Sequence, residues 1–136
     1  MIVLDTDIFI DYFRGLTQAG EYLRSLSLSE NDCRCTDITV MELFRGAEGK
    51  RDLQRIKKFL RENGFASLPV TSPASRLAVE LLEQYGLSHG LGIPDALIAG
   101  VVLSVGAKLI TGNSRHFDFI PGLSVARPPY RSFSNV

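Results

Sequence analysis

Acidic residues stand beside predicted strand ends or helix starts at four widely separated places in the sequence. Asp5 directly follows a short apolar run, and Asp118 lies just beyond the last clear strand. Glu42 and Asp95 fall in the first turns of two predicted helices. Clustered carboxylates raise one another's pKa unless a cation offsets their charge, and their hard oxygen atoms suit Mg²⁺ or Mn²⁺. Such an ion polarises a phosphoryl oxygen and activates water, so the acids predict metal-assisted hydrolysis.

Each of these acids also has a purely structural explanation. Glu42 stands three residues after Thr39, in the spacing of a capping box at a helix start. Asp95 in a first helical turn interacts favourably with the helix dipole. Asp5 and Asp7 could cap the first helix. The spacing alone leaves both explanations open.

The apolar pattern alternates short runs with helical spacing along the chain. The predicted strands cover residues 2–4, 33–36, 65–70 and 108–111. The predicted helices run from Thr6 or Asp7 to Arg14, over residues 18–26, 39–46, 50–63 and 72–86, and from Pro94 to Val105, before a Pro-rich tail poor in strands. Strands separated by helices imply a parallel sheet covered on both faces. We therefore expect an α/β fold, a three-layer α/β/α sandwich with a central mostly parallel sheet, whose ligands gather at the carboxyl ends of the strands.

Length and composition limit the class of protein. A chain of 136 residues fits one domain over residues 1–136. The 15 basic and 15 acidic side chains cancel, which excludes a chain-wide electrostatic attraction to nucleic acid. No apolar run approaches the ~20 residues of a membrane helix, and no basic segment precedes residues 2–4. Cys33 and Cys35 are poorly spaced for a disulfide. We expect a cytoplasmic protein that does not enter a membrane.

Basic residues gather between Arg45 and Arg61. On a neutral chain they predict a local positive surface for RNA phosphates, with Arg45 and Arg51 as candidate contacts. The alternative is the solvated face of an amphipathic helix.

Four sequence blocks, in order along the chain, carry a resemblance to a known family. They are Met1-Ile-Val-Leu-Asp-Thr-Asp7, Ile38-Thr-Val-Met-Glu-Leu-Phe-Arg-Gly-Ala47, Ile93-Pro-Asp-Ala-Leu-Ile-Ala99 and Leu109-Ile-Thr-Gly-Asn-Ser-Arg-His-Phe117, followed by Ile120-Pro-Gly-Leu123. The chain resembles PIN-domain proteins, above all the VapC-type toxins of toxin–antitoxin pairs. The resemblance implies an acid set that holds Mg²⁺ or Mn²⁺ and supports endonucleolytic RNA cleavage. By position it assigns Asp5, Glu42 and Asp95 to this set, and it places Thr6 and Asn113 close to the metal, where both are also candidate RNA contacts.

Two departures from the family pattern concern the fourth acidic position. The first block usually reads Asp-Thr-Asn, whereas this chain has Asp7 in the third place. The last block commonly offers an acid where this chain has Asn113 or His116, and the nearest carboxylate is Asp118. Asp118, Asn113 and Asp7 are therefore the candidates for the fourth position. We expect Asp118, because Asp7 is the better cap of the first helix.

The residues and the resemblance together predict a metal-dependent endoribonuclease that is the toxin of a VapBC-type pair. The alternative is a non-catalytic PIN-like module that binds RNA or a partner. We also expect a small antitoxin protein as partner and a homodimer. The helix from Pro94 to Val105 supports the dimer, since it is more apolar than one buried face requires.

Overall fold

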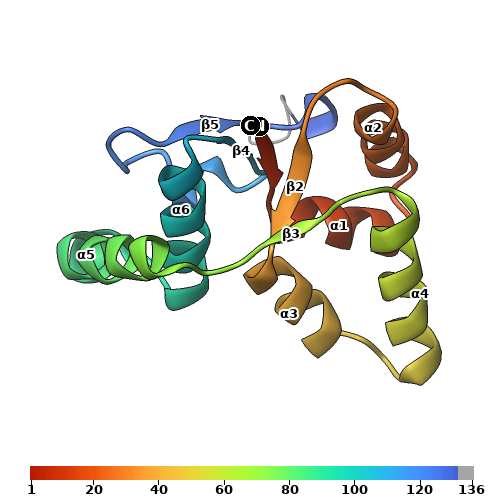
Figure 1. Ribbon diagram of the computed structural model, residues 1–136, viewed down its shortest axis with the longest axis horizontal. Coiled ribbons are helices and arrows are strands. Elements are labelled where there is room, and N and C mark those ends of the chain that lie inside the picture. Colours follow the sequence, from red (N-terminus) through yellow and green to blue (C-terminus); the bar gives the residue numbers. More distant parts are fainter. Residues whose placement is uncertain (132–136) are drawn as a thin grey trace.

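A five-stranded sheet lies at the centre of the computed structural model, which describes residues 1–131 (Figure 1). In spatial order the strands are β3 (Ser67–Leu68), β2 (Cys33–Thr36), β1 (Ile2–Leu4), β4 (Lys108–Ile110) and β5 (Ser124–Ala126). Every neighbouring pair of strands is parallel. The carboxyl ends of all the strands consequently meet at one edge of the sheet.

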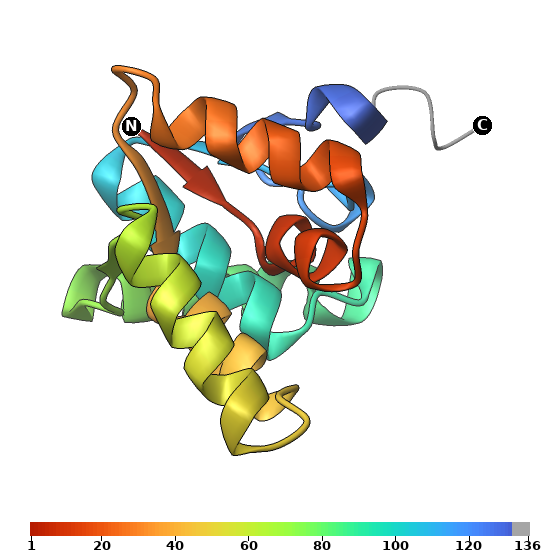
Figure 2. The ribbon, with the colours of Figure 1, turned by 90° about the vertical axis from the view of Figure 1, so that its right-hand side faces the viewer.

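Helices cover both faces of this sheet (Figures 1 and 2). On one side lie α5 (Ser72–His89) and α6 (Ile93–Val105), and on the other lie α1 (Thr6–Phe13), α2 (Thr17–Ser27) and α4 (Lys50–Glu62). The helix α3 (Asp37–Arg45) follows β2 directly, and the short 3₁₀ helices η1 (Ser114–His116) and η2 (Pro129–Arg131) follow β4 and β5. The predicted three-layer α/β/α fold around a parallel sheet is confirmed.

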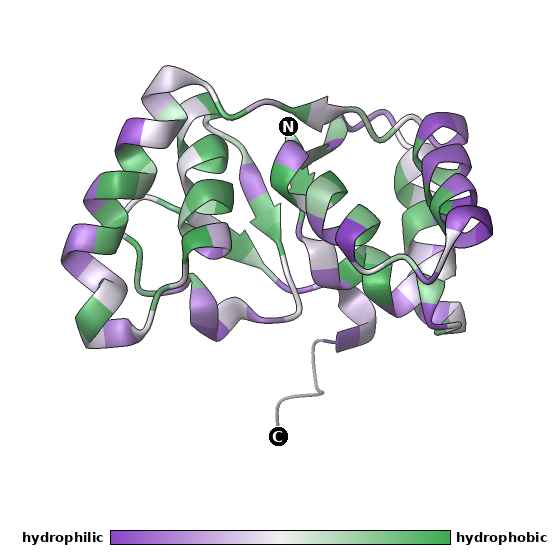
Figure 3. Ribbon diagram, turned by 90° about the horizontal axis from the view of Figure 1, so that it is seen from below, coloured by the Kyte–Doolittle hydropathy of each residue, from purple (hydrophilic) through white to green (hydrophobic). Residues whose placement is uncertain are grey.

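The alternation of side chains along the strands divides the core into two clusters. Val3 and Leu109 contribute to the cluster on the side of α5 and α6, whereas Leu4 and Ile110 contribute to the cluster on the side of α1 and α2. These strand residues are fully or almost fully buried. Figure 3 shows hydrophobic residues along the strands and α6 and a largely hydrophilic α4.

The apolar side chains of α6 are buried within the chain itself, where α6 packs closely against α5. Ala96, Ala99 and Val102 on α6 are buried without residual exposure. A Cβ atom at Gly100 would collide with the backbone carbonyl of Ala74 on α5, so the two helices approach as closely as glycine permits. In the part of the chain that the structure describes, no helix is long and apolar enough to span a membrane.

The helix ends differ from the predicted ones by up to three residues, and the caps only partly agree. The cap of α1 is the Asp5 side chain, which accepts from the Thr6 N–H; Asp5 is one of the predicted caps, whereas Thr6 and Asp7 are not caps. Thr36 caps α3, so Thr39 lies inside the helix and the predicted capping box is wrong. The helix α5 continues through Gly86 to His89 and ends at Gly90, which has the left-handed φ of 67°.

The outer strands also differ from the predictions. The third strand is Ser67–Leu68, shorter than the predicted range of 65–70. The tail contains β5, which the Pro-rich sequence does not reveal. Its residues pair with β4 in register, Lys108 with Ser124 and Ile110 with Ala126. Val125 favours a strand, but a three-residue segment becomes one only through this pairing.

Candidate active site

Asp5 lies where β1 ends and α1 begins, and only 6% of its surface is exposed. One of its carboxylate oxygens accepts a hydrogen bond from the Thr6 N–H at 2.7 Å, and the other accepts one from the Thr111 hydroxyl at 2.7 Å. Burial, and then the charge of Asp7, raise the pKa of Asp5 to about 7, although both hydrogen bonds act in the opposite direction. A cation beside this carboxylate would remove much of the cost of ionising it.

Glu42 is connected to the start of α1 through Thr6. The Thr6 hydroxyl donates to Glu42 Oε1 at 2.8 Å and lies 2.9 Å from the hydroxyl of Thr39. Glu42 stands in the second turn of α3, because this helix begins at Asp37 and not at Thr39 as predicted. Thr6 itself is 6% exposed, so its hydroxyl lies in the interior and orients Glu42.

Asp95 lies in the first turn of α6 and faces His116 of η1. The distance between His116 Nδ1 and Asp95 Oδ2 is 3.3 Å. Burial raises the pKa of Asp95, the nearby His116 lowers it, and the charge of Glu42 raises it again. Asp95 is thus coupled by charge to Glu42, as Asp5 is coupled to Asp95. The structure therefore brings Asp5, Glu42 and Asp95 to the same edge of the sheet.

Asp118, the expected fourth acid, lies on the surface after η1. Its backbone N–H donates to the Ser114 carbonyl at 2.8 Å. Its carboxylate forms no hydrogen bond and no ion pair with any residue from 1 to 131, and it does not contribute to the pKa shifts of Asp5 or Asp95. The structure does not show Asp118 joined to the other acids.

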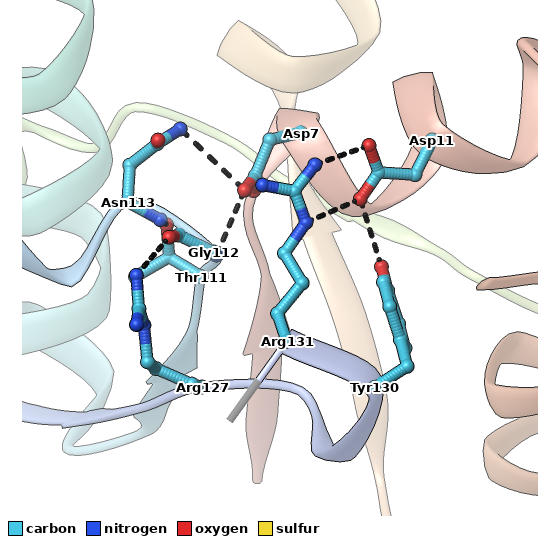
Figure 4. A network of polar contacts seen from close by, with 8 residues as sticks. All are labelled: Asp7, Asp11, Thr111, Gly112, Asn113, Arg127, Tyr130 and Arg131. Carbon is cyan, nitrogen blue, oxygen red and sulfur yellow. Dashed lines mark hydrogen bonds and ion pairs between the residues drawn. The ribbon is translucent and has the colours of Figure 1, made fainter. Parts of the chain in front are cut away.

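Asp7, in contrast, lies against the loop that follows β4 (Figure 4). Its Oδ2 accepts a hydrogen bond from the Gly112 N–H at 2.8 Å and lies 3.5 Å from the Asn113 side-chain amide nitrogen. Its Oδ1 is buried and has no hydrogen bond of good geometry in the described chain, and the Ile8 N–H lowers the pKa of Asp7 only as the weakest of several causes. Burial raises the pKa of Asp7, while the Gly112 N–H and the charge of Arg131 lower it. Since Asp5 is the cap of α1, the reason for preferring Asp118 to Asp7 does not hold.

The acids fit a hydrated hard cation better than a closed metal cage. Within residues 1–131, no group of three or more His, Cys, Asp or Glu side chains is arranged to hold a metal ion. Mg²⁺ keeps several waters and commonly binds proteins through one or two carboxylates, so it does not need such a group. The orphaned Asp7 oxygen and the mutual repulsion of the carboxylates both favour a cation or its waters at this edge.

A cavity of about 270 Å³ continues from Glu42 between α1, α3 and α4, and basic and acidic side chains line it. Arg14 and Arg55 are among the lining residues, and the Arg55 guanidinium lies over the Phe13 ring and pairs with Asp52. The predicted RNA contacts Arg45 and Arg51 are exposed on α3 and α4 and do not line the cavity. The sequence marks Arg14 only as the end of a helix.

Comparison with known proteins gives consistent matches over nearly the whole chain. The PIN domain family matches residues 2–122. The chain is 30% identical to Ribonuclease VapC19 of Mycobacterium tuberculosis over 131 residues, 96% of this chain and 100% of that protein. Its structure is similar to a toxin–antitoxin complex from Klebsiella pneumoniae, with TM-score 0.74 and 29% identity over 94% of this chain and 98% of that one. It is also similar to VapBC-1 from nontypeable Haemophilus influenzae, with TM-score 0.73 and 26% identity over 93% and 98% of the two chains.

The matched region contains the four acids Asp5, Asp7, Glu42 and Asp95. Fold, topology and sequence agree over this region. The chain therefore belongs to the PIN-domain family.

Proposed function

We propose that this protein is a metal-dependent endoribonuclease and the toxin of a VapBC-type toxin–antitoxin pair. The observation that carries the proposal is the coupling of Asp5, Glu42 and Asp95 by charge at one edge of a PIN-domain sheet. A cation stabilises the ionised form of repelling carboxylates, and a hard cation is suited to phosphodiester hydrolysis. The relatives named as a ribonuclease and as a toxin–antitoxin complex support the choice of substrate and partner.

The three acids have distinct roles in this proposal. Asp5 and Asp95 are the principal ligands of Mg²⁺ or Mn²⁺. Glu42 binds the ion directly or through water and orients the attacking water, and the Thr6 hydroxyl holds Glu42 in place. The Thr111 hydroxyl supports Asp5 in its ionised form, because a hydrogen bond to a carboxylate favours the charged state.

The bound ion supplies charge that polarises the scissile phosphate and lowers the pKa of water. The side chains supply position. Asp5 is buried and Asp95 is partly buried, so their electrostatic interactions are stronger than those between fully exposed groups. Arg45 and Arg51, exposed on α3 and α4, are proposed to hold RNA phosphates, and Arg14 and Arg55 line the cavity that adjoins Glu42.

A small antitoxin and a second copy of the chain are the proposed protein partners, in the cytoplasm. Support for the antitoxin comes from the similar toxin–antitoxin complex. For the dimer, large hydrophobic side chains on the contacting helices α3 and α6 are exposed, with Met41 at 58% and Ile93 at 65%. The buried part of α6 does not support a dimer, because it is covered by α5 within the chain.

A non-catalytic binding module is the second candidate function. It is favoured by one observation, that no group of three ligand side chains in the described part of the chain is arranged around a metal position. Such a module would bind RNA without cutting it.

An RNA-cleavage assay separates the two candidates. We expect the purified protein to cleave RNA with Mg²⁺ or Mn²⁺ and to lose this activity in EDTA. Asp95→Asn keeps the shape of the side chain but removes a charge that the cation needs, so we expect at least about a hundredfold loss of cleavage and no growth inhibition on expression. Arg34→Ala, in an exposed ion pair with Asp32, is the control and should cleave normally. Equal cleavage by native protein and Asp95→Asn would falsify the proposal.

A further inference from the structure

The last described turn of the chain is bound to α1 through Asp11. The Arg131 guanidinium forms a two-point ion pair with the Asp11 carboxylate, with Arg131 Nε donating to Oδ2 at 2.9 Å and Nη2 to Oδ1. The Tyr130 hydroxyl donates to the same Oδ2 at 3.1 Å (Figure 4). Only 11% of the Asp11 side chain is exposed, so this pair is partly desolvated and geometrically specific.

Asp7 lies one helical turn before Asp11, on the same face of α1. Gly112 lies in close contact with both Asp7 and Arg131. A Cβ atom at Gly112 would stand 2.5 Å from Asp7 Oδ2 and 2.8 Å from Arg131 Cδ. The backbone at Gly112 is not in the left-handed region, so glycine is required here for close approach and not for conformation. The Arg131 side chain therefore packs against Gly112 next to the Asp7 carboxylate.

Consecutive residues after β4 hold two acids. The Thr111 hydroxyl donates to Asp5, and the Gly112 N–H donates to Asp7. The carbonyl of Gly112 in turn accepts a hydrogen bond from Arg127 Nη2 at 2.8 Å. Arg127 thus holds the backbone at Gly112, next to the two residues that donate hydrogen bonds to Asp5 and Asp7.

The contacts from residues 127–131 lie outside the region matched by the PIN domain family, which ends at residue 122. We propose that residues 127–131 hold the Asp7 carboxylate at the acidic edge, so that Asp7 is a further carboxylate facing the bound cation and Arg131 and Arg127 are its positioning residues. This inference rests on the metal site of the proposed function. It assigns the orphaned Asp7 oxygen to the cation or its waters.

Mn²⁺ binding to the full chain, measured by isothermal titration calorimetry without RNA, tests the inference. We expect Asp7→Asn to weaken Mn²⁺ binding at least about tenfold, because the site loses a charge. Arg131→Ala should weaken it at least about threefold, and the double variant should bind like Asp7→Asn alone, since positioning a lost carboxylate has no effect. Independent, multiplying effects of the two substitutions would overturn the proposal, as would unchanged Mn²⁺ binding in Asp7→Asn or no Mn²⁺ binding by the native chain.

Two further variants separate positioning from charge and from loss of folding. Arg131→Lys keeps the charge but cannot grip both oxygens of Asp11, so we expect incomplete recovery of Mn²⁺ binding. Full recovery of Mn²⁺ binding in Arg131→Lys would show that only the positive charge of residue 131 matters, and would contradict the positioning role. Gly112→Ala places a methyl group against Asp7 and should weaken Mn²⁺ binding while thermal unfolding shows a folded protein. Arg34→Ala, which also breaks an Arg–Asp pair, is the matched control and should bind Mn²⁺ normally.

Calorimetry tests the positioning role, and the cleavage assay tests the proposed ribonuclease activity, so either proposal can be refuted without the other. A native chain that binds Mn²⁺ with the expected coupling but does not cut RNA refutes the proposed ribonuclease and leaves the positioning role standing. A chain that cuts RNA but shows no coupling between Asp7 and Arg131 refutes the positioning role alone.

Discussion

Asp5 is a residue at which stability and chemistry oppose each other. Folding buries its carboxyl group beside Asp7 and raises its pKa from 3.8 to about 7. Between these values the unfolded chain has released the proton and the folded chain has not, so the folded state loses stability as the pH rises through this window. A bound divalent cation reverses this loss, because it favours the ionised form.

Asp5→Asn is therefore expected to stabilise the metal-free protein. Asn caps a helix as well as Asp does: its one amide oxygen accepts from the Thr6 N–H, and its amide nitrogen donates to the Thr111 hydroxyl, which turns to accept. In EDTA at pH 7 we expect the free energy of unfolding to rise by about 2 to 4 kcal/mol, and the gain to disappear below about pH 4. Urea unfolding across this pH range measures both. A variant less stable than the native protein at pH 7 would contradict the burial argument.

At this scale the sequence predicted the acids better than their partners. Asp5, Glu42 and Asp95 are recognisable because each stands near a strand end or helix start in a family block. The groups that hold Asp5 and Asp7 come from Thr111, Gly112 and Arg131, more than 100 residues away in the sequence. Nothing local to Thr111 marks its hydroxyl as a partner of Asp5, apart from its place after a strand that pairs with β1.

At the scale of elements, two helical glycines have opposite expected roles. Gly100 on α6 touches the backbone of α5, whereas Gly86 on α5 has open space around its Cβ position, with Leu82 no nearer than 4.0 Å. Because Gly86 has ordinary helical geometry, Gly86→Ala should stabilise the protein by about 0.5–1 kcal/mol. Gly100→Ala should destabilise it by about 1–3 kcal/mol through overpacking, despite the better helix propensity of alanine.

Urea unfolding of both glycine variants under the same conditions measures the two changes in the free energy of unfolding. Stabilisation by Gly100→Ala would show that α5 and α6 can separate without cost. Close contact with α5 would then no longer explain the apolar sequence of α6.

Element boundaries could be predicted only in part, for physical reasons. A glycine such as Gly86 reads as a helix end, but packing against a neighbouring helix outweighs its propensity cost of about 1 kcal/mol. Thr36 and Thr39 are both good caps, and the sequence does not say which one accepts the hydrogen bond. β5 exists because β4 offers a free edge, a fact of the whole sheet that the Pro-rich tail does not contain.

At the scale of the molecule, the proposed homodimer remains a prediction. The exposed side chains of Met41 and Ile93 lie on helices that contact each other. Light scattering should give a mass of about 30 kDa, twice the 15.0 kDa of one chain, at micromolar concentration. Met41→Glu should shift the equilibrium towards the monomer, because a buried unpaired charge is costly. A monomer in the native protein at high micromolar concentration would contradict the dimer.

Because the net charge of the chain is zero, RNA phosphates must be attracted by a local positive surface. The salt dependence of RNA affinity in single variants can identify the residues of that surface. Each phosphate neutralised on a single strand contributes a slope of about −0.7 to the plot of log affinity against log salt concentration. In EDTA, which prevents cleavage, fluorescence anisotropy with a labelled RNA should give a slope that becomes shallower by about 0.7 in Arg51→Ala and again in Arg45→Ala. Arg34→Ala, on β2, should leave the slope unchanged. If the slopes of Arg45→Ala and Arg51→Ala equal the native slope, these residues form only a solvated helix face, and Arg14 and Arg55, which line the cavity beside Glu42, become the next phosphate contacts to test.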